Sequence, residues 1–201
     1  MEVGKSTPGG HRNFKVVQKI IAARPVFEIY DEQTGEKVAV AKQTWFSILR
    51  STVNFEDAQG NKILTAKGGF FDKTFWLKDR EGKTIAKLTR PWIALRKNFK
   101  IFYHDDVLKA QGGLLAWGFE ANTSVGAFAF RLDKKILAIR DQFRVSVGDY
   151  MEWLHAVASA VVVDRVFFRG RSRCGCCICI AFLLLVLFGL LILSSLLVSL
   201  P

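Results

Sequence analysis

The first 173 residues of this 201-residue chain contain no cysteine, so the main part of the protein is not built on a disulfide framework. All four cysteines lie in one short segment: Cys174, Cys176, Cys177 and Cys179. A structural zinc site usually takes two pairs of ligands separated by a loop, and ligands crowded into one segment fit that geometry poorly. We therefore predict no metal site in this protein.

Charge is missing from the end of the chain, because no Asp, Glu, Lys or Arg occurs from residue 174 to residue 201. Residues 178–200 are rich in Leu, Ile, Val and Phe, and from Ile180 onward only Gly189 and three serines interrupt the run. A helix over these residues would be about 34 Å long, slightly more than a hydrocarbon core of about 30 Å. A core helix of that length normally shows a polar stripe. The segment therefore predicts a single membrane-spanning helix.

An apolar run is also missing from the N-terminus, where residues 1–13 are polar and predicted to be disordered. The chain begins without the apolar region of a secretory signal. Gly4-Lys5-Ser6-Thr7 has the residues that end a phosphate-binding loop, but the first glycine and the strand of that motif are absent. These features predict a tail-anchored protein without a nucleotide-binding loop.

The segment 169–177 is a basic, cysteine-rich linker before the predicted span. Lys and Arg favour the cytoplasmic side of a membrane, so we expect residues 1–173 to face the cytosol. A long span suits the thicker endomembranes or the plasma membrane. Cysteines beside basic residues are common targets of S-acylation, and the alternative is that they are small apolar residues at a helix end. The basic residues of the linker are Arg169, Arg171 and Arg173.

Residue patterns that support catalysis or sequence-specific nucleic-acid binding are scarce. The three histidines, His11, His104 and His155, have neither a nucleophile nor metal-ligand spacing around them. No helix-turn-helix, zinc finger or RNA-recognition pattern is present. We therefore predict a protein that is not an enzyme, needs no cofactor and binds no nucleic acid. Its 29 basic and 18 acidic side chains give a net charge of +11, which favours an anionic membrane surface as partner.

Residues 14 to 147 repeat one pattern, in which strand-forming segments flank an acidic turn with glycine. Three copies are FEIYDEQTGEKVAVAK, VNFEDAQGNKILTAK and FWLKDREGKTIAKLTR, with turn glycines Gly35, Gly60 and Gly82. Each copy predicts an antiparallel hairpin, and about a dozen strands follow from the whole region, as in a sandwich or closed barrel. A helix is predicted over 149–168, with Asp149 as its N-cap. Its middle is small and apolar all round, which predicts burial on every side.

The order of these features resembles the tubby C-terminal-like superfamily, which includes phospholipid scramblases and LURP-one-related proteins. The resemblance covers residues 14–168 and rests on EDAQGNKIL, GKTIAKLTRPWIALRKNFKIF and RDQFRVSVGDYMEW. It implies a mainly β fold, a barrel of about twelve antiparallel strands around a buried hydrophobic helix. It also implies a function without catalysis, because tubby-type domains bind phosphoinositides and scramblases are linked to calcium-dependent lipid movement.

The chain departs from the scramblase pattern at the acidic cluster that is proposed to bind calcium. Only Asp141 and Asp149 match it, and on a strand their carboxylates would lie roughly 26 Å apart. Calcium takes six to eight oxygens within about 2.6 Å, so we expect no calcium site.

The sequence favours a membrane-tethered cytosolic module that binds anionic phospholipid, phosphoinositide or a protein partner. The alternative is a scramblase-type lipid transporter, and an uncharacterised enzyme is less well supported. The segment RPWIALRKNFK interleaves aromatic and basic residues, as an interfacial lipid contact does, although such residues also occur on solvated strands. The predicted lipid-binding residues are Arg90, Trp92, Arg96, Lys97 and Lys100, together with Arg169, Arg171 and Arg173.

Overall fold

The structure is a computed structural model that describes residues 11–21, 24–44, 51–69, 73–90, 98–112, 118–134 and 142–165. The chain divides into two compact units, Met1–Val163 and Asp164–Pro201, and the second lies almost wholly outside the described residues. The account below therefore concerns the first unit.

Twelve strands and one helix make up the described part of the first unit, and every paired strand runs antiparallel to its neighbours. The strands are β1 (Arg12–Ile21), β2 (Arg24–Asp31), β3 (Lys37–Gln43), β4 (Thr52–Glu56), β5 (Lys62–Gly68), β6 (Thr74–Lys78), β7 (Thr84–Thr89), β8 (Asn98–Tyr103), β9 (Asp106–Gly112), β10 (Gly118–Asn122), β11 (Phe128–Lys134) and β12 (Gln142–Val147). The helix is α1 (Trp153–Asp164). The predicted mainly β barrel is confirmed.

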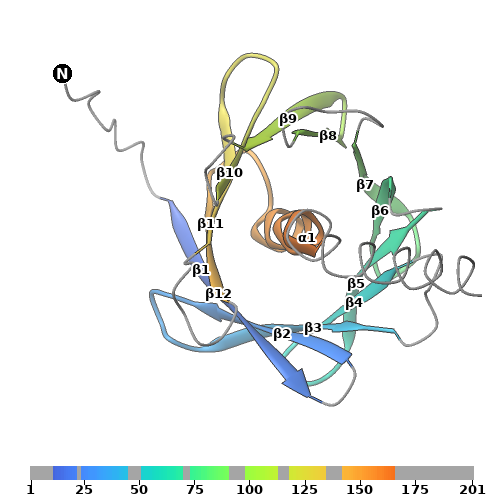
Figure 1. The fold of residues 1–201 in the computed structure, drawn as a ribbon, viewed down its shortest axis with the longest axis vertical. Helices are drawn as coiled ribbons and strands as arrows, with labels where there is room; N and C mark the ends of the chain where they lie inside the picture. The colour runs from blue at the N-terminus through green and yellow to red at the C-terminus, as the bar shows by residue number, and fades with distance from the viewer. Residues whose placement is uncertain are drawn as a thin grey trace, which may run out of the picture. The chain divides into compact units, whose positions relative to one another are not determined.

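The strands follow one another around a closed ring, each paired with the next in sequence (Figure 1). The ring closes where β12 pairs with β1, from Arg12 opposite Val147 to Val17 opposite Gln142. Closure leaves no free sheet edge along the paired region, because each strand of the ring finds a neighbour on both sides. Connections that follow even-numbered strands all lie at one end of such a barrel, which we call the turn end.

Glycine turns occupy the turn end, as the sequence pattern predicts. Gly60 and Gly82 have φ of +86° and +88°, a left-handed conformation that other residues adopt at a cost. The N–H of Gly60 donates to the carbonyl of Asp57 at 3.1 Å, and the Asp57 carboxylate accepts the N–H of Asn61 at 2.8 Å. The acidic residue therefore closes the turn with both its backbone and its side chain.

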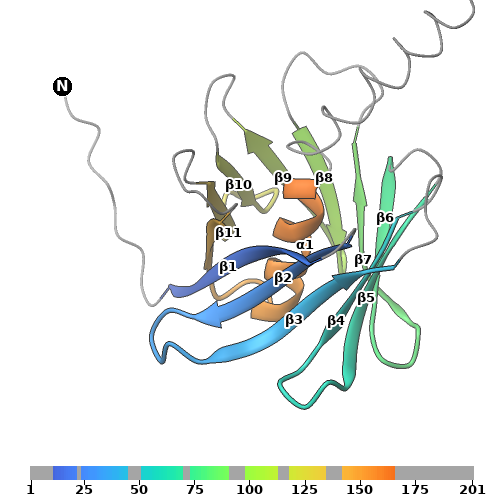
Figure 2. The ribbon, with the colours of Figure 1, turned by 60° about the horizontal axis from the view of Figure 1, so that its bottom comes forward.

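The helix α1 lies inside the ring of strands (Figure 1), and Figure 2 shows it behind β1–β3. Every side chain from Ala156 to Val163 is fully enclosed, whichever face of the helix it occupies. These residues are Ala, Val and one serine, and their small size lets the helix fit within a ring whose wall supplies the bulky groups. Seven phenylalanines of the strands are fully buried: Phe14, Phe27, Phe55, Phe75, Phe99, Phe119 and Phe130.

Two predicted boundaries differ from the structure. The strand β1 begins at Arg12, inside the predicted disordered segment 1–13, because the Arg12 guanidinium is held 2.7 Å from the buried carboxylate of Asp31. The helix begins at Trp153, so Asp149 is not its N-cap. Asp149 belongs to the turn that follows β12. At the start of the helix, the N–H of Ala156 donates to the carbonyl of Glu152.

No helix among the described residues is both long and apolar enough to cross a membrane. The predicted span at 178–200 and the linker at 169–177 lie outside those residues.

Candidate functional site

The outer surface of neighbouring strands β5 to β9 is the candidate site. Strands β5 to β8 contain no Asp or Glu, and β9 contains only Asp106, at its first position. Strand side chains alternate between the core and solvent, so the residues between the buried ones point outward. Four exposed lysines and two aromatic rings meet on this surface, which we call the lysine face: Lys67, Lys87, Lys100, Lys109, Trp76 and Phe102.

Cations and aromatic rings alternate along one row of the lysine face. The strand register places Lys67 opposite Trp76, Trp76 opposite Lys87, and Lys87 opposite Phe102. The Lys87 ammonium lies 5.8 Å from the centre of the Phe102 ring, within the range of a cation–π contact. Phe102 is 40% exposed, more than the other phenylalanines that the structure describes. The row therefore presents an exposed apolar ring, Phe102, directly beside the positive charge of Lys87.

A second row brings like charges together. Lys100 on β8 lies directly opposite Lys109 on β9, and both side chains are exposed. Like charges in this position repel each other and destabilise a strand pair. Neither lysine makes an ion pair within the described residues. An anion held between the two ammonium groups would relieve that repulsion.

The basic side chains elsewhere on the barrel wall contrast with the lysine face, because most of them have carboxylate partners. Lys19 lies 2.8 Å from Glu28, and a guanidinium nitrogen of Arg144 lies 2.9 Å from Glu32. Further pairs on these strands join Arg12 to Asp31, Lys42 to Glu56 and Arg131 to Glu120. The net positive charge of the described barrel is thus concentrated on one side.

In a comparison with family models, residues 12–164 match the LURP-one-related family. The match covers most of the chain. The chain belongs to the LURP-one-related family. The family is part of the tubby-like superfamily, which accords with the twelve-stranded barrel around a helix. The resemblance noted in the sequence is therefore confirmed.

A solved structure supports the LURP-one-related fold. It is the X-ray structure of a protein from Arabidopsis thaliana, 15% identical in sequence, with a TM-score of 0.56. The similarity covers 77% of this chain and 91% of the Arabidopsis chain. At this identity it supports the fold alone. No curated protein matches the sequence.

Two of the predicted lipid-binding residues lie on described parts of the LURP-one-related barrel. Lys100 belongs to the lysine face. Arg90 follows β7, and its N–H donates to the carbonyl of Lys73 at 3.0 Å. Burial lowers the pKa of Lys73, and the positive charge of Arg90 lowers it further. Arg90 therefore lies in a second basic neighbourhood, at the end of the barrel opposite the turn end.

The remaining predicted site residues lie outside the described residues: Trp92, Arg96, Lys97, Arg169, Arg171, Arg173, Cys174, Cys176, Cys177 and Cys179. Their predicted roles in lipid binding and S-acylation stay predictions. Within the described part of the chain, no group of three or more His, Cys, Asp or Glu side chains is arranged to hold a metal ion.

Sequence reasoning missed most of the lysine face. Its members come from five strands that span more than forty positions of the chain, and a search for charges within one segment finds only Lys100. Alternation along NFKIFY does place Lys100 and Phe102 on the same face of β8. Which lysines of β7 and β9 lie beside them depends on strand register, which the sequence alone leaves open.

Proposed function

We propose that this protein is a lipid-binding module whose lysine face contacts the anionic surface of a membrane. The observation that carries the proposal is the separation of charge around the barrel. Lys67, Lys87, Lys100 and Lys109 have no carboxylate partners among the described residues, whereas the basic residues of the strands on the other side are mostly paired.

The aromatic rings favour a membrane over a soluble anion. Phe102 and Trp76 lie among the lysines, and rings at this position can enter the headgroup region while the ammonium groups meet phosphates. Each basic residue near an anionic membrane contributes about 1 kcal/mol. Phosphatidylserine and phosphoinositides both supply the required charge. A protein partner with an acidic surface is the competing interpretation, and the experiment below separates the two.

We further propose that the barrel is tethered to the membrane it binds. The apolar segment 178–200, with Arg169, Arg171 and Arg173 before it, supports a tail anchor with the barrel in the cytosol at an endomembrane or the plasma membrane. S-acylation of Cys174, Cys176, Cys177 or Cys179 would strengthen the tether. Acyl exchange on the protein from cells, compared with a variant in which serine replaces all four cysteines, measures that modification.

Vesicle co-sedimentation of residues 1–168 tests the lipid contact without the apolar tail. Vesicles of phosphatidylcholine alone are compared with vesicles that also contain phosphatidylserine or a phosphoinositide. We expect binding only to the anionic vesicles, weakening as salt rises, because the Debye length is about 8 Å at physiological ionic strength. The variant Lys87→Glu/Lys100→Glu/Lys109→Glu should lose this binding. Equal sedimentation of wild type and variant would refute the lipid contact and favour a protein partner.

A further inference from the structure

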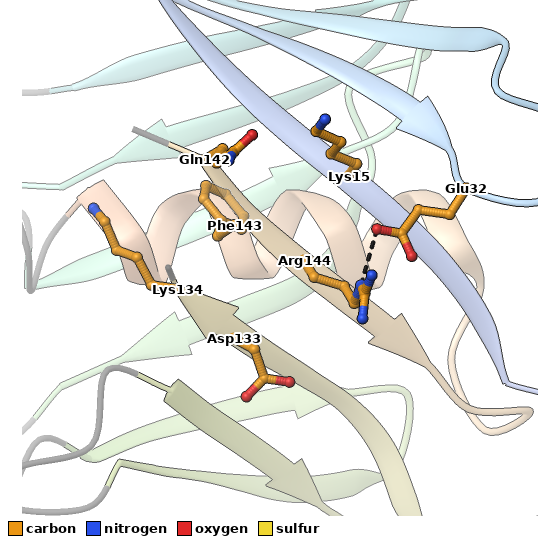
Figure 3. A pocket seen from close by; sticks show the side chains of 7 residues that line it. All are labelled: Lys15, Glu32, Asp133, Lys134, Gln142, Phe143 and Arg144. Carbon is orange, nitrogen blue, oxygen red and sulfur yellow. Dashed lines mark hydrogen bonds and ion pairs between the residues drawn. The ribbon is translucent and has the colours of Figure 1, made fainter. Parts of the chain in front are cut away.

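A pocket opens on the wall of the barrel where β12 closes the ring between β1 and β11 (Figure 3). Its volume is about 240 Å³. In the order of the strands around the ring, β12 lies opposite β6, so this seam pocket and the lysine face are on opposite walls. The side chains of Lys15, Glu32, Asp133, Lys134 and Arg144 line it (Figure 3), and the ring of Phe143 supplies an apolar surface.

Arg144 lies at the centre of the pocket. The register places it opposite Lys15 on β1 and opposite Asp133 on β11. Its Nε donates to Glu32 Oε1 at 2.9 Å, as the dashed line in Figure 3 marks. Within the described residues this is the only hydrogen bond of the guanidinium, so its terminal N–H groups can donate to a ligand. Glu32 therefore holds Arg144 in place.

Opposite charges flank Arg144. Lys15 is exposed and makes no ion pair with any described residue. The residue opposite it, Arg144, is also a cation. Asp133 is likewise exposed and has no ion-pair partner in the described part of the chain. Two strand spacings separate the backbones of β1 and β11, or about 10 Å. The pocket thus offers an anion-binding side at Lys15 and a cation-binding side at Asp133.

We propose that the seam pocket binds a small zwitterion, a molecule with a phosphate or carboxylate group near an ammonium group. The anionic group lies between the Lys15 ammonium and the terminal N–H groups of Arg144, and the ammonium group lies at the Asp133 carboxylate. Arginine suits this role because its planar fork of donors matches phosphate and carboxylate oxygens. The volume is below the roughly 300 Å³ at which pockets for drug-sized ligands begin, which favours a ligand of few atoms.

Isothermal titration calorimetry on the full chain in non-ionic detergent tests the proposal, with phosphoethanolamine as the probe. Inorganic phosphate and ethanolamine are titrated separately as the two halves of the probe. We expect phosphoethanolamine to bind more tightly than either half. Charge-assisted hydrogen bonds are strong enough that losing one costs about tenfold or more in affinity.

Two variants divide the contributions. Lys15→Gln should weaken phosphoethanolamine and phosphate alike by about tenfold. Asp133→Asn should weaken phosphoethanolamine by a similar factor and leave phosphate unchanged or tighter. Both side chains are exposed and unpaired within the described residues, so both variants should keep the circular dichroism spectrum of the wild type. Lys83→Gln is the matched control and should bind as the wild type does, because Lys83 is exposed in the turn between β6 and β7, outside both the pocket and the lysine face.

The proposal is overturned if phosphoethanolamine does not bind, if Lys15→Gln and Lys83→Gln bind it equally, or if Asp133→Asn weakens phosphate as much as phosphoethanolamine. Because the lysine face is untouched by the two pocket variants, failure here leaves the lipid contact standing. A lipid headgroup and a free molecule share the proposed chemistry. Reconstitution with phosphatidylethanolamine distinguishes them: a reduced affinity for soluble phosphoethanolamine identifies the headgroup as ligand, and an unchanged affinity identifies a free molecule.

Discussion

His155, on the first turns of α1, is held by residues from two parts of the chain. Its Nδ1 lies 3.1 Å from the Tyr103 hydroxyl, and its Nε2 lies 3.5 Å from the Glu152 carboxylate. The Tyr103 oxygen also accepts the backbone N–H of Glu152. Neutral His155 satisfies this arrangement if Nδ1 accepts from Tyr103 and Nε2 carries the hydrogen toward Glu152. A proton on Nδ1 would remove the acceptor that the tyrosine hydroxyl uses.

Burial lowers the pKa of His155, and the Glu152 carboxylate opposes that effect in part. The unfolded chain therefore takes up a proton on this histidine at a higher pH than the native protein does. The contribution of His155 to the free energy of unfolding is fully present above the unfolded pKa of about 6.5. It is lost as the pH drops below that value. Between about pH 7.5 and about pH 5.5, we expect the free energy of unfolding to fall by up to about 1.4 kcal/mol through this group.

Urea denaturation at the two pH values measures the effect. His155→Gln should lose most of the pH dependence, whatever its stability at pH 7.5. His104 is exposed and has a φ of +50°, and its positive charge lowers the pKa of His155 less than burial does. His104→Asn, which tolerates that conformation, should therefore keep most of the pH dependence. If His155→Gln keeps the pH dependence of the wild type, His155 has the same pKa in the folded and the unfolded protein.

At the residue scale, turn glycines were the part of the fold that the sequence predicted best. Gly35, Gly60 and Gly82 all have positive φ, because an acidic turn followed by glycine has a local geometry that needs no distant contact. Gly126 was missed. Its turn begins with Thr123, whose hydroxyl accepts the N–H of Ala127 at 2.9 Å in the way that Asp57 does elsewhere. A search for acidic turns could not find it.

At the element scale, α1 was predicted correctly in character and incorrectly at its start. The uninterrupted run of small apolar residues requires burial on all sides, and the barrel provides it. Asp149 was favoured as N-cap because Asp is common there. The chain instead makes a turn at Asp149 and Tyr150, and the Tyr150 hydroxyl donates to the Asp106 carboxylate at 3.2 Å. That contact joins residues far apart in sequence, and the local pattern does not show it.

Substitutions within α1 test its place in the core. Ala158 and Val161 are fully enclosed. We expect Ala158→Leu to lower the free energy of unfolding by about 1 to 3 kcal/mol through overpacking. Val161→Asp should do more damage, because it buries a carboxylate without a partner. Val125→Asp is the control, since Val125 is 88% exposed in the turn between β10 and β11. If Val161→Asp and Val125→Asp unfold at the same urea concentration, α1 does not lie in the core.

For the whole molecule, the prediction of about twelve strands holds, and their neighbours follow from the hairpin repeat. Hairpins place each strand beside the next, so the order around the ring is readable from the chain. The closing contact between β1 and β12 is not, because it joins strands at opposite ends of the domain. The lysine face and the seam pocket both depend on strand register, which places Lys100 beside Lys109 and Arg144 between Lys15 and Asp133.

A truncation tests the completeness of the barrel. The ring of strands and α1 are contained within residues 12–164, and the family match has the same bounds. We expect residues 1–168 to be soluble and folded, with a cooperative urea transition followed by circular dichroism. A chain ending at residue 150 lacks α1 and should not fold, because the interior of the barrel would lose the helix side chains that pack against the strands. An unfolded or insoluble 1–168 protein would contradict the boundary.

Positive charge is concentrated on the lysine face of the described barrel. A matched charge reversal tests most directly whether this face contacts an anionic membrane. Vesicle affinity of the triple variant at Lys87, Lys100 and Lys109 is compared with that of Lys37→Glu/Lys62→Glu/Lys83→Glu, which makes the same change in net charge at exposed lysines of the turn end. Losing three lysines at about 1 kcal/mol each should weaken the binding of the first variant to anionic vesicles by more than about a hundredfold, and the three glutamates add repulsion. The second should bind within a few fold of wild type. Equal losses in the two variants would contradict a defined lysine face and leave only the attraction of a basic protein for an anionic surface.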